Sequence, residues 1–337
     1  MRTILAVTVL AGCTDYNLNG PAVHEGKYNP PDLTTPIQTD HITQVTIPAV
    51  DVLWIIDNSG SMAEEQRALR DNFTSFMQYF TDSGLDYHVG VVSTDMDNKK
   101  ESGKLVDDSS HSGRYIDTSM SGDEAVASFR DRADLGTFGS SYECGLDAAY
   151  VALTDERDRT NSGFYRPEAS LSMVVISDEH DQSADNRLGV GSTSEFISWA
   201  EGLKTKEGMV SFSSIVGLTN ADCPEAEKGM GYLEATNSIG GIKASICDSD
   251  WSGVLTELGL QAAGLKREFY LSLRPVEETI TVSVTTDGEE EGFDEGDDWT
   301  YDAARNSITF VEYVPDPLSV VNIDYEVLAS SQNTADE

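Results

Sequence analysis

The hydrophobic positions of the chain change their spacing in a regular alternation up to about residue 265. Residues 50–56 (VDVLWII) are almost continuously apolar, which is typical of a strand buried on both faces of a parallel sheet. Residues 62–81 carry apolar side chains at helical spacing and predict an amphipathic helix. Further apolar runs and helical segments follow: YHVGVVST, LSMVVIS and MVSFSSIVG, and residues 143–153, 193–204 and 249–264. This order predicts an α/β domain with a doubly wound, mostly parallel sheet over residues 48–265.

The spacing changes in the C-terminal part of the chain. Runs with strand character follow one another without a helical segment between them: EFYLSL, TITVSVTT, SITFVEYV and SVVNIDYEVL. Several alternate with period two, so residues 266–329 are predicted to form a small antiparallel β domain of about four strands. The acidic stretch 287–298 (DGEEEGFDEGDD) lacks EF-hand spacing and is expected to be a solvated hairpin loop. Residues 330–337 are predicted to be a polar tail, and the Gly/Ser/Asp-rich residues 95–122 an irregular excursion.

The N-terminal residues carry an export pattern. MRTILAVTVLAGC places one arginine before a short apolar run and small residues before Cys13. The pattern predicts a signal peptide over residues 1–12, too short for a permanent membrane span. Its ending, LAGC, resembles the lipobox of bacterial lipoproteins, which implies that Cys13 becomes lipid-modified. Residues 13–47 are polar, contain NPPDLTTP and are predicted to be a tether. We expect an exported protein of the bacterial cell envelope, in the outer membrane or at the cell surface, attached to the membrane only through its N-terminal lipid.

The charge of the chain limits its partners. Acidic residues number 59 and basic residues 22, which gives a formal net charge of -37. A surface of this sign repels phosphate backbones, so nucleic acid is not an expected partner. It is compatible with cations, with basic partners, or with adaptation to a salty environment that screens the repulsion.

The cysteines suggest one disulfide. Cys223 and Cys247 lie in the same irregular region, and export exposes them to an oxidising compartment. A disulfide between them is therefore expected, and it would contribute about 3 kcal/mol on the chain-entropy model. Cys144 begins a helical segment and is expected to be a buried thiol.

Two apolar strands end on an aspartate. Asp57 follows VDVLWII and Asp178 follows LSMVVIS, and Ser59 and Ser61 add hydroxyl groups just after the first strand. Because ligands of open parallel sheets bind beyond the carboxyl ends of the strands, both carboxylates are expected at one edge. Carboxylate and hydroxyl oxygens there suit a hard divalent cation. The alternative is structural: Ser61 with Glu64 also fits a helix capping box, and Ser59 can shape a turn.

The stretch DNSGSM resembles the metal-ion-dependent adhesion site of von Willebrand factor type A domains, and the resemblance covers about residues 48–262. It implies that Asp57, Ser59 and Ser61 supply the D-x-S-x-S ligands and that Asp178 supplies the aspartate after the fourth strand. A further hydroxyl is implied before a helix, and the sequence offers three candidates in LGTFGSSYECGLDAA: Ser141 first, then Ser140, and Thr137. The implied ion is Mg²⁺, with Ca²⁺ or Mn²⁺ as alternatives. The implied partner is a protein that offers a carboxylate to the ion.

The wider chain resembles secreted bacterial lipoproteins that carry such a domain, in segments including DYHVGVVSTD, VVISDEHD and DDWTYDAARNSITF. We therefore expect a binding protein of the envelope, acting in adhesion or protein–protein interaction, and not an enzyme. Two alternatives stay open at this stage. One is an envelope scaffold whose metal is only structural. The other is a metal-dependent hydrolase, although G-x-S-x-G and H-E-x-x-H motifs are missing from the sequence.

Overall fold

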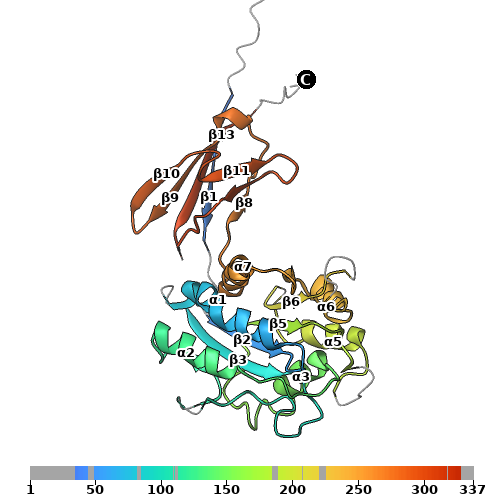
Figure 1. Ribbon diagram of the computed structural model, residues 1–337. Coiled ribbons are helices and arrows are strands. Elements are labelled where there is room, and N and C mark those ends of the chain that lie inside the picture. The colour runs from blue at the N-terminus through green and yellow to red at the C-terminus, as the bar shows by residue number, and fades with distance from the viewer. Residues whose placement is uncertain are drawn as a thin grey trace, which may run out of the picture.

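The computed structural model arranges the chain as an α/β unit and a β-sandwich (Figure 1). It describes residues 35–44, 49–81, 85–108, 110, 113–183, 189–206, 208–219, 225–316 and 318–327. The predicted signal peptide, Cys13, Cys223 and the polar tail lie outside these residues. None of the helices in the described ranges combines the length and the apolar character that crossing a bilayer requires.

The α/β unit is built on a sheet whose described strands run in the order β4-β3-β2-β5-β6-β7. The strands are β2 (Ala49–Ile56), β3 (Asp86–Ser93), β4 (Ile116–Asp117), β5 (Ser170–Ser177), β6 (Val210–Val216) and β7 (Lys243–Ser245). All neighbours pair in parallel except β4, which is antiparallel to β3. Ile56, the last residue of β2, faces Ser93 on one side and Ile176 on the other. The predicted doubly wound, mostly parallel sheet is confirmed.

Helices cover both faces of this sheet. The face carrying α1 (Ala63–Thr81), α2 (Gly122–Arg132) and α7 (Ser252–Ala263) receives Val50, Val52, Trp54 and Ile56 of β2. The other face carries α3 (Gly145–Leu153), α5 (Thr193–Glu201) and α6 (Tyr232–Ile239) and receives Leu53 and Ile55. The period-two alternation of a strand thus serves two cores, which explains why β2 is apolar at successive positions.

Trp54 is the centre of the first core. Its ring centroid lies 5.9, 5.1 and 5.6 Å from those of Phe73, Phe76 and Phe129, all in edge-to-face contact. Burial of each such aromatic side chain contributes about 1.5–3 kcal/mol. The aromatic cluster therefore holds α1, which follows the D-x-S-x-S loop, and α2 on the sheet.

Helix α2 was not predicted from the hydrophobic pattern, which placed an irregular excursion over residues 95–122 and resumed helical spacing at 143. The helix begins with a capping box: the Ser121 hydroxyl accepts from the Glu124 amide, and the Glu124 carboxylate accepts from the Ser121 amide. This local signal is present in the sequence. It was missed because only a narrow stripe, including Ala125 and Phe129, faces the core.

The C-terminal unit is a sandwich of two antiparallel sheets, ordered β1-β13-β9-β10 and β11-β12-β8 among the described strands. Their bounds are β1 (Ile37–Thr43), β8 (Glu268–Tyr270), β9 (Thr281–Thr286), β10 (Glu289–Phe293), β11 (Trp299–Asp302), β12 (Ser307–Phe310) and β13 (Val320–Glu326), with a 3-10 turn at Glu277–Thr279. Side chains from both sheets share one core, including Val284, Trp299, Phe310 and Ile323. The expected antiparallel β domain is confirmed.

Strand β1 corrects the prediction that all of residues 13–47 form a tether. It pairs antiparallel with β13, and Figure 1 shows this N-terminal segment among the C-terminal strands. The strand escaped detection because most of its side chains are at least partly exposed, which hides the hydrophobic pattern. Asp40 is its one buried residue: its carboxylate accepts from the Ser272 amide at 2.7 Å, just after β8 of the other sheet, and from the hydroxyl of Tyr325 in the neighbouring strand β13 at 2.8 Å.

The acidic stretch 287–298 is also more ordered than a solvated loop. Asp287 and Gly288 have φ of 53° and 87°, the left-handed pair that a tight two-residue hairpin requires. The hairpin joins β9 to β10, and the register pairs Glu289 with Thr286. β10 is an edge strand carrying exposed glutamates, which discourages pairing with another chain.

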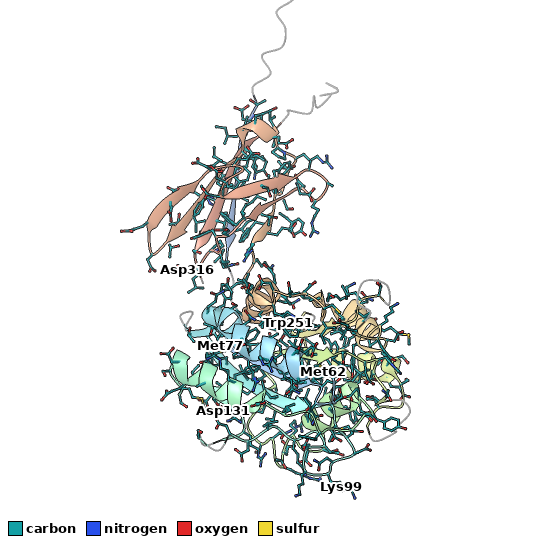
Figure 2. All side chains as sticks on the ribbon, viewed as in Figure 1. Met62, Met77, Lys99, Asp131, Trp251 and Asp316 are labelled. Carbon is teal, nitrogen blue, oxygen red and sulfur yellow. The ribbon has the colours of Figure 1, made fainter. Side chains whose placement is uncertain are left out.

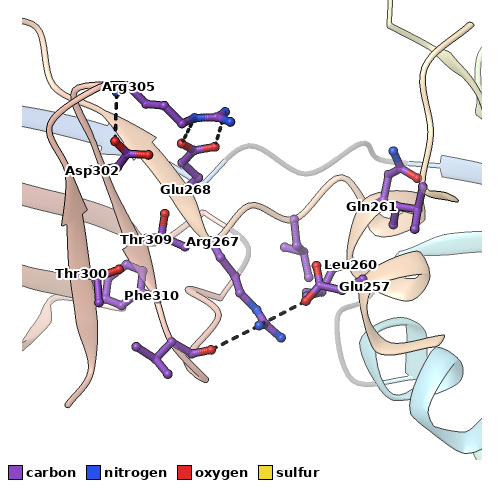
Figure 3. Close-up of a pocket in the computed structure, with 13 residues that line it drawn as sticks. Glu257, Leu260, Gln261, Arg267, Glu268, Thr300, Asp302, Arg305, Thr309 and Phe310 are labelled. Atoms are coloured by element: carbon purple, nitrogen blue, oxygen red, sulfur yellow. Dashed lines mark hydrogen bonds and ion pairs between the residues drawn. The ribbon is translucent and has the colours of Figure 1, made fainter. Parts of the chain in front are cut away.

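The two units meet around α7. The chain returns to the sandwich at residues 264–268, and the buried Gln44 side chain, which follows β1, donates to the carbonyl oxygens of Lys266 (2.9 Å) and Pro315 (3.3 Å). Arg267 reaches Glu257 of α7 with Nη1 and Oε1 3.2 Å apart, at a cavity of about 670 Å³ (Figure 3). In Figure 2, Asp316 marks the end of the sandwich that faces the α/β unit. Lys99 marks the end of the α/β unit that is farthest from the sandwich.

Candidate metal centre

The sheet register brings the two predicted aspartates to one edge. Asp57 follows β2 and Asp178 follows β5, and these strands are direct neighbours. The Asp57 amide donates to the Ile176 carbonyl at 3.0 Å, which fixes the relative height of the two strand ends. Both side chains are buried, Asp57 completely and Asp178 to all but 8%. Burial raises the pKa of Asp57, and the charge of Asp178 raises it further.

The D-x-S-x-S loop is arranged around the Asp57 carboxylate. Its Oδ1 accepts from the Ser59 amide at 2.8 Å, and its Oδ2 accepts from the Ser177 hydroxyl at 2.7 Å. The hydroxyl oxygens of Ser59 and Ser61 lie 3.2 Å apart. Helix α1 begins at Ala63, one residue later than a cap at Ser61 would give. The Ser61 hydroxyl thus lies with the carboxylate loop, as the ligand hypothesis requires.

The three candidates for the further hydroxyl lie in the loop before α3 and differ in their contacts and exposure. The Ser140 hydroxyl donates to the Asp97 carboxylate at 2.7 Å, and its amide donates to Asp95 at 3.1 Å. Ser141 is exposed and Thr137 is half-buried. Ser140 therefore serves a neighbouring loop rather than the carboxylates at the strand ends.

Glu143 lies at Asp57 instead. It is completely buried, and it lies close enough to Asp57 for the charge of that carboxylate to raise its pKa. Burial and the negative charge of Asp57 raise the pKa of Glu143 to about 9, although the hydroxyl of Thr94, which donates to it, acts in the opposite direction. Sequence reasoning used Glu143 only as the start of a helix. An acidic residue at that position is common, so the sequence carries no signal that singles it out.

The loop carrying these residues docks directly on the D-x-S-x-S loop. The Gly139 amide donates to the Asn58 carbonyl at 2.9 Å. A Cβ at Gly139 would lie 2.2 Å from the Asn58 side-chain oxygen and 2.7 Å from its carbonyl oxygen. Only glycine permits this approach, so the sequence FGSSYE has its glycine where the two loops touch.

The segment after Asp178 supports α3. The Asp181 carboxylate accepts from the Leu146 amide at 3.1 Å in the first turn of the helix, where Cys144 provides no side-chain cap. Burial raises the pKa of Asp181 to about 6. His180 lies 2.7 Å from Glu227 in a surface pair. Asp181 thus has a structural role in holding the loop that follows β5.

Several buried oxygen atoms at this edge have no hydrogen-bond partner among the described residues: Asn58 Oδ1, Glu65 Oε2, Glu143 Oε1 and Asp178 Oδ1. An unpaired buried polar atom costs about 1–3 kcal/mol, more when it is charged. Burial also raises the pKa of Glu65 and of Glu179, and nearby Asp178 adds to both shifts. Oxygen atoms of this kind, together with the hydroxyl groups of Ser59 and Ser61, fit a hard divalent cation.

Carboxylates alone do not form a complete set of metal ligands at this edge. Within the described ranges, no group of three or more Asp, Glu, His or Cys side chains is arranged to hold a metal ion by itself. A cation at this edge therefore needs the serine hydroxyl groups as well as carboxylates. That requirement agrees with the D-x-S-x-S motif, in which two of the three ligands are hydroxyl groups.

The cysteines were not predicted to be ligands of the ion. Cys144 is a buried thiol at the start of α3. Cys247 takes part in a disulfide, and its expected partner Cys223 lies outside the described residues, so the pairing itself stays a prediction.

Comparison with known proteins gives similarity only to solved structures. No family model matches the chain, and no curated protein matches it. Proximal thread matrix protein 1 from the mussel byssus aligns with 66% of this chain and 48% of its own, at 11% identity and a TM-score of 0.42. A von Willebrand factor type A protein from Catenulispora acidiphila aligns with 88% and 66%, at 12% identity and a TM-score of 0.41. The pilus adhesin SpaC from Lactobacillus rhamnosus GG aligns with 90% and 42%, at 12% identity and a TM-score of 0.40.

This chain thus spans less than two thirds of the length of each of these proteins. At such identities and TM-scores, the fold assignment rests on the strand order and register described above, and the candidate site rests on the contacts around Asp57.

Proposed function

We propose that this protein binds a divalent cation at the carboxyl edge of its sheet and uses it to bind a protein partner. Asp57, Ser59, Ser61 and Asp178 would hold the ion, with Mg²⁺ expected first and Ca²⁺ or Mn²⁺ as alternatives. The observation that carries this proposal is the pair of buried aspartates on neighbouring strand ends, one of which has a carboxylate oxygen without a partner among the described residues. Buried like charges favour a cation between them.

The chemistry of the ion suggests what the partner offers. A divalent cation supplies a positive point on a strongly acidic protein, and a carboxylate of a partner can bind there. Ser59 and Ser61 contribute neutral oxygens, which leave more of the positive charge available than a fully anionic ligand set would.

Exposed apolar side chains beside the site favour a protein as the partner. Phe138 is 100% exposed, Tyr142 57% and Met230 53%. Phe138 precedes Gly139, which contacts Asn58, and Tyr142 precedes Glu143, while the Met230 carbonyl accepts from the Asp181 amide at 2.9 Å. We call these three side chains the apolar rim. Exposed aromatic and methionine side chains next to a site are typical of protein interfaces.

Asp57→Ala tests the proposal. We expect calorimetry with Mg²⁺, Ca²⁺ and Mn²⁺ to show binding to the wild-type chain and at least a 10-fold loss, about 1.4 kcal/mol, in the variant. Capture of a partner from the native envelope should require the cation and should disappear with chelator and in the variant. Glu289→Gln on the exposed strand β10 is the matched control, since it removes a carboxylate remote from the site.

Other results would point to the alternatives. A folded Asp57→Ala variant that still captures the partner would support a scaffold with a structural ion. Substrate turnover that depends on Asp57 would support a hydrolase. No heat of binding with any of the three cations in the wild type would contradict the proposal itself.

We also propose that the protein is exported and anchored through lipid on Cys13. The support for this is the N-terminal sequence alone, since these residues lie outside the described structure.

A further inference from the structure

Glu143 has surroundings that a structural role does not account for. It immediately precedes Cys144 at the start of α3 and pairs through its backbone with Asp95. Its side chain is completely buried, Oε2 accepts from the Thr94 hydroxyl, and Oε1 has no partner among the described residues. A side chain that only anchored α3 would be expected to have both oxygens paired.

The acidic groups near Glu143 increase the free-energy cost of burying its carboxylate. Asp57 and Glu179 both act on it through space, and both are acids. Removing two like charges from water without a counter-charge costs several kcal/mol. A cation beside Asp57 would offset that cost and would also use the unpaired Oε1.

Thr94 holds Glu143 toward Asp57 through a short chain of backbone contacts. The Thr94 amide donates to the carbonyl of Ile56, the residue before Asp57, at 3.1 Å, and the Cys144 amide donates to the Thr94 carbonyl at 3.2 Å. Thr94 is itself completely buried. The end of β2, the end of β3 and the start of α3 are thereby joined at one point, which leaves the Glu143 carboxyl little freedom to turn away.

We propose that Glu143 is a ligand of the same cation as Asp57, supplying a carboxylate at the position where the adhesion-site motif supplies a hydroxyl, with Thr94 as its positioning residue. This inference rests on the proposed cation site. Two carboxylates with the hydroxyl groups of Ser59 and Ser61 form a donor set suited to a hard divalent cation. Asp178, on the neighbouring strand, would hold the ion together with these groups.

Glu143→Gln tests this, because it keeps the shape of the side chain and removes its charge. We expect titration of the chelator-treated full-length chain with Mg²⁺, Ca²⁺ and Mn²⁺ to show at least a 10-fold weaker affinity for the ion that the wild type binds most tightly. Glu179→Gln is the matched control, because Glu179 is a half-buried acid near the same edge whose carboxylate accepts from Gln182 at 3.2 Å. It should change the affinity by less than about 3-fold, and Asp57→Asn should abolish binding.

A melting experiment separates ligation from a structural role. In chelator, Glu143→Gln should melt at about the wild-type temperature, because a neutral amide of the same shape is no more costly to bury beside Asp57 than the carboxyl group. Added cation should then raise its melting temperature less than it raises that of the wild type. A lower melting temperature in chelator, with an unchanged rise on adding cation, would mean that Glu143 is only structural.

Two outcomes distinguish this inference from the proposed function. If the wild type binds cation, Asp57→Asn does not, and Glu143→Gln binds as the wild type does, only the role of Glu143 is overturned. If the wild type binds none of the three cations, both proposals fall together. Should Glu143→Gln not fold, Thr94→Val provides the second test, since loss of the orienting hydroxyl should weaken cation binding about 3-fold or more, and unchanged binding would contradict the inference.

Discussion

Asp40 and Glu143 are both buried acids, but their surroundings move their pKa in opposite directions. Burial alone raises the pKa of Asp40, yet hydrogen bonds from Ser272, Gln38 and Tyr325 outweigh it and lower the pKa below its ordinary value. Glu143 receives one hydroxyl hydrogen bond and faces another carboxylate, so its pKa is raised to about 9. Asp40 is therefore a satisfied structural carboxylate, and Glu143 is an unsatisfied one.

Asp40→Asn should destabilise the sandwich by about 2 kcal/mol at pH 7, because hydrogen bonds to a charged group contribute about 1.5–3 kcal/mol. A carboxyl group with a lowered folded-state pKa stabilises fully above its ordinary pKa of 3.8 and loses that contribution as the pH falls through the lowered value. The difference between variant and wild type should therefore shrink below about pH 4. Urea unfolding followed by circular dichroism at pH 7 and pH 3 measures it, and a difference that does not change with pH would contradict the assignment.

At the scale of elements, the carboxyl edge of the sheet is formed by loops that dock on one another. The loop after β2, the loop before α3 and the segment after β5 touch through Gly139, Asn58 and Asp181. Hydrophobic side chains of the same loops, including Phe138, point outward. The loops thus present the apolar rim beside the carboxylates, and binding at the edge would involve both.

Phe138→Ser should weaken cation-dependent capture of the partner at least 10-fold, about 1.4 kcal/mol, because exposed aromatic side chains contribute strongly to interfaces. It should leave cation affinity unchanged, since the side chain contacts solvent. Leu318→Ser is the control: Leu318 is 76% exposed but lies in the sandwich, next to β13. Equal capture by the Phe138 and Leu318 variants would exclude the rim from the interface. Capture is quantified by immunoblotting against a dilution series.

The elements also show where pattern recognition stops. Helices α1 and α3 show helical spacing and strands β2 and β5 are continuous apolar runs, because these elements enter one or both cores. Strand β1 buries mainly Asp40, and strand β10 is exposed apart from the half-buried Phe293. Such edge strands form because a neighbour offers backbone hydrogen bonds, and the sequence of the strand alone does not show that neighbour.

At the scale of the whole molecule, the sandwich is assembled from chain segments that precede and follow the α/β unit in the sequence. The chain enters the sandwich as β1, leaves it for the α/β unit and returns after α7. Gln44 binds the Lys266 carbonyl, and the Arg267–Glu257 pair connects the units across the cavity. The chain has a formal net charge of -37. Added salt screens repulsion between like charges and should therefore favour association with an acidic partner.

Cys13→Ser should release the whole molecule from the membrane. If lipid on Cys13 is the anchor, radiolabelled palmitate should label the wild type expressed in a bacterial host and should not label the variant. The wild type should sediment with membranes and the variant should move to the supernatant, because the variant lacks the residue that carries the proposed lipid. A variant that still sediments with membranes would contradict lipid anchoring. Cys144→Ser, at a buried thiol in the α/β unit, controls for loss of a cysteine as such.

The amino-acid sequence by itself determined the class of the α/β sheet and the meeting of Asp57 and Asp178, because continuous apolar runs make buried parallel strands and parallel strands end at one edge. Only the tertiary structure decided which residue of the loop before α3 turns inward. Gly139 against Asn58 and Ser140 against Asp95 and Asp97 set the path of that loop, and the path leaves Ser141 exposed and Glu143 buried. Side-chain direction in a loop follows from contacts between segments far apart in the chain, and local residue order does not specify those contacts.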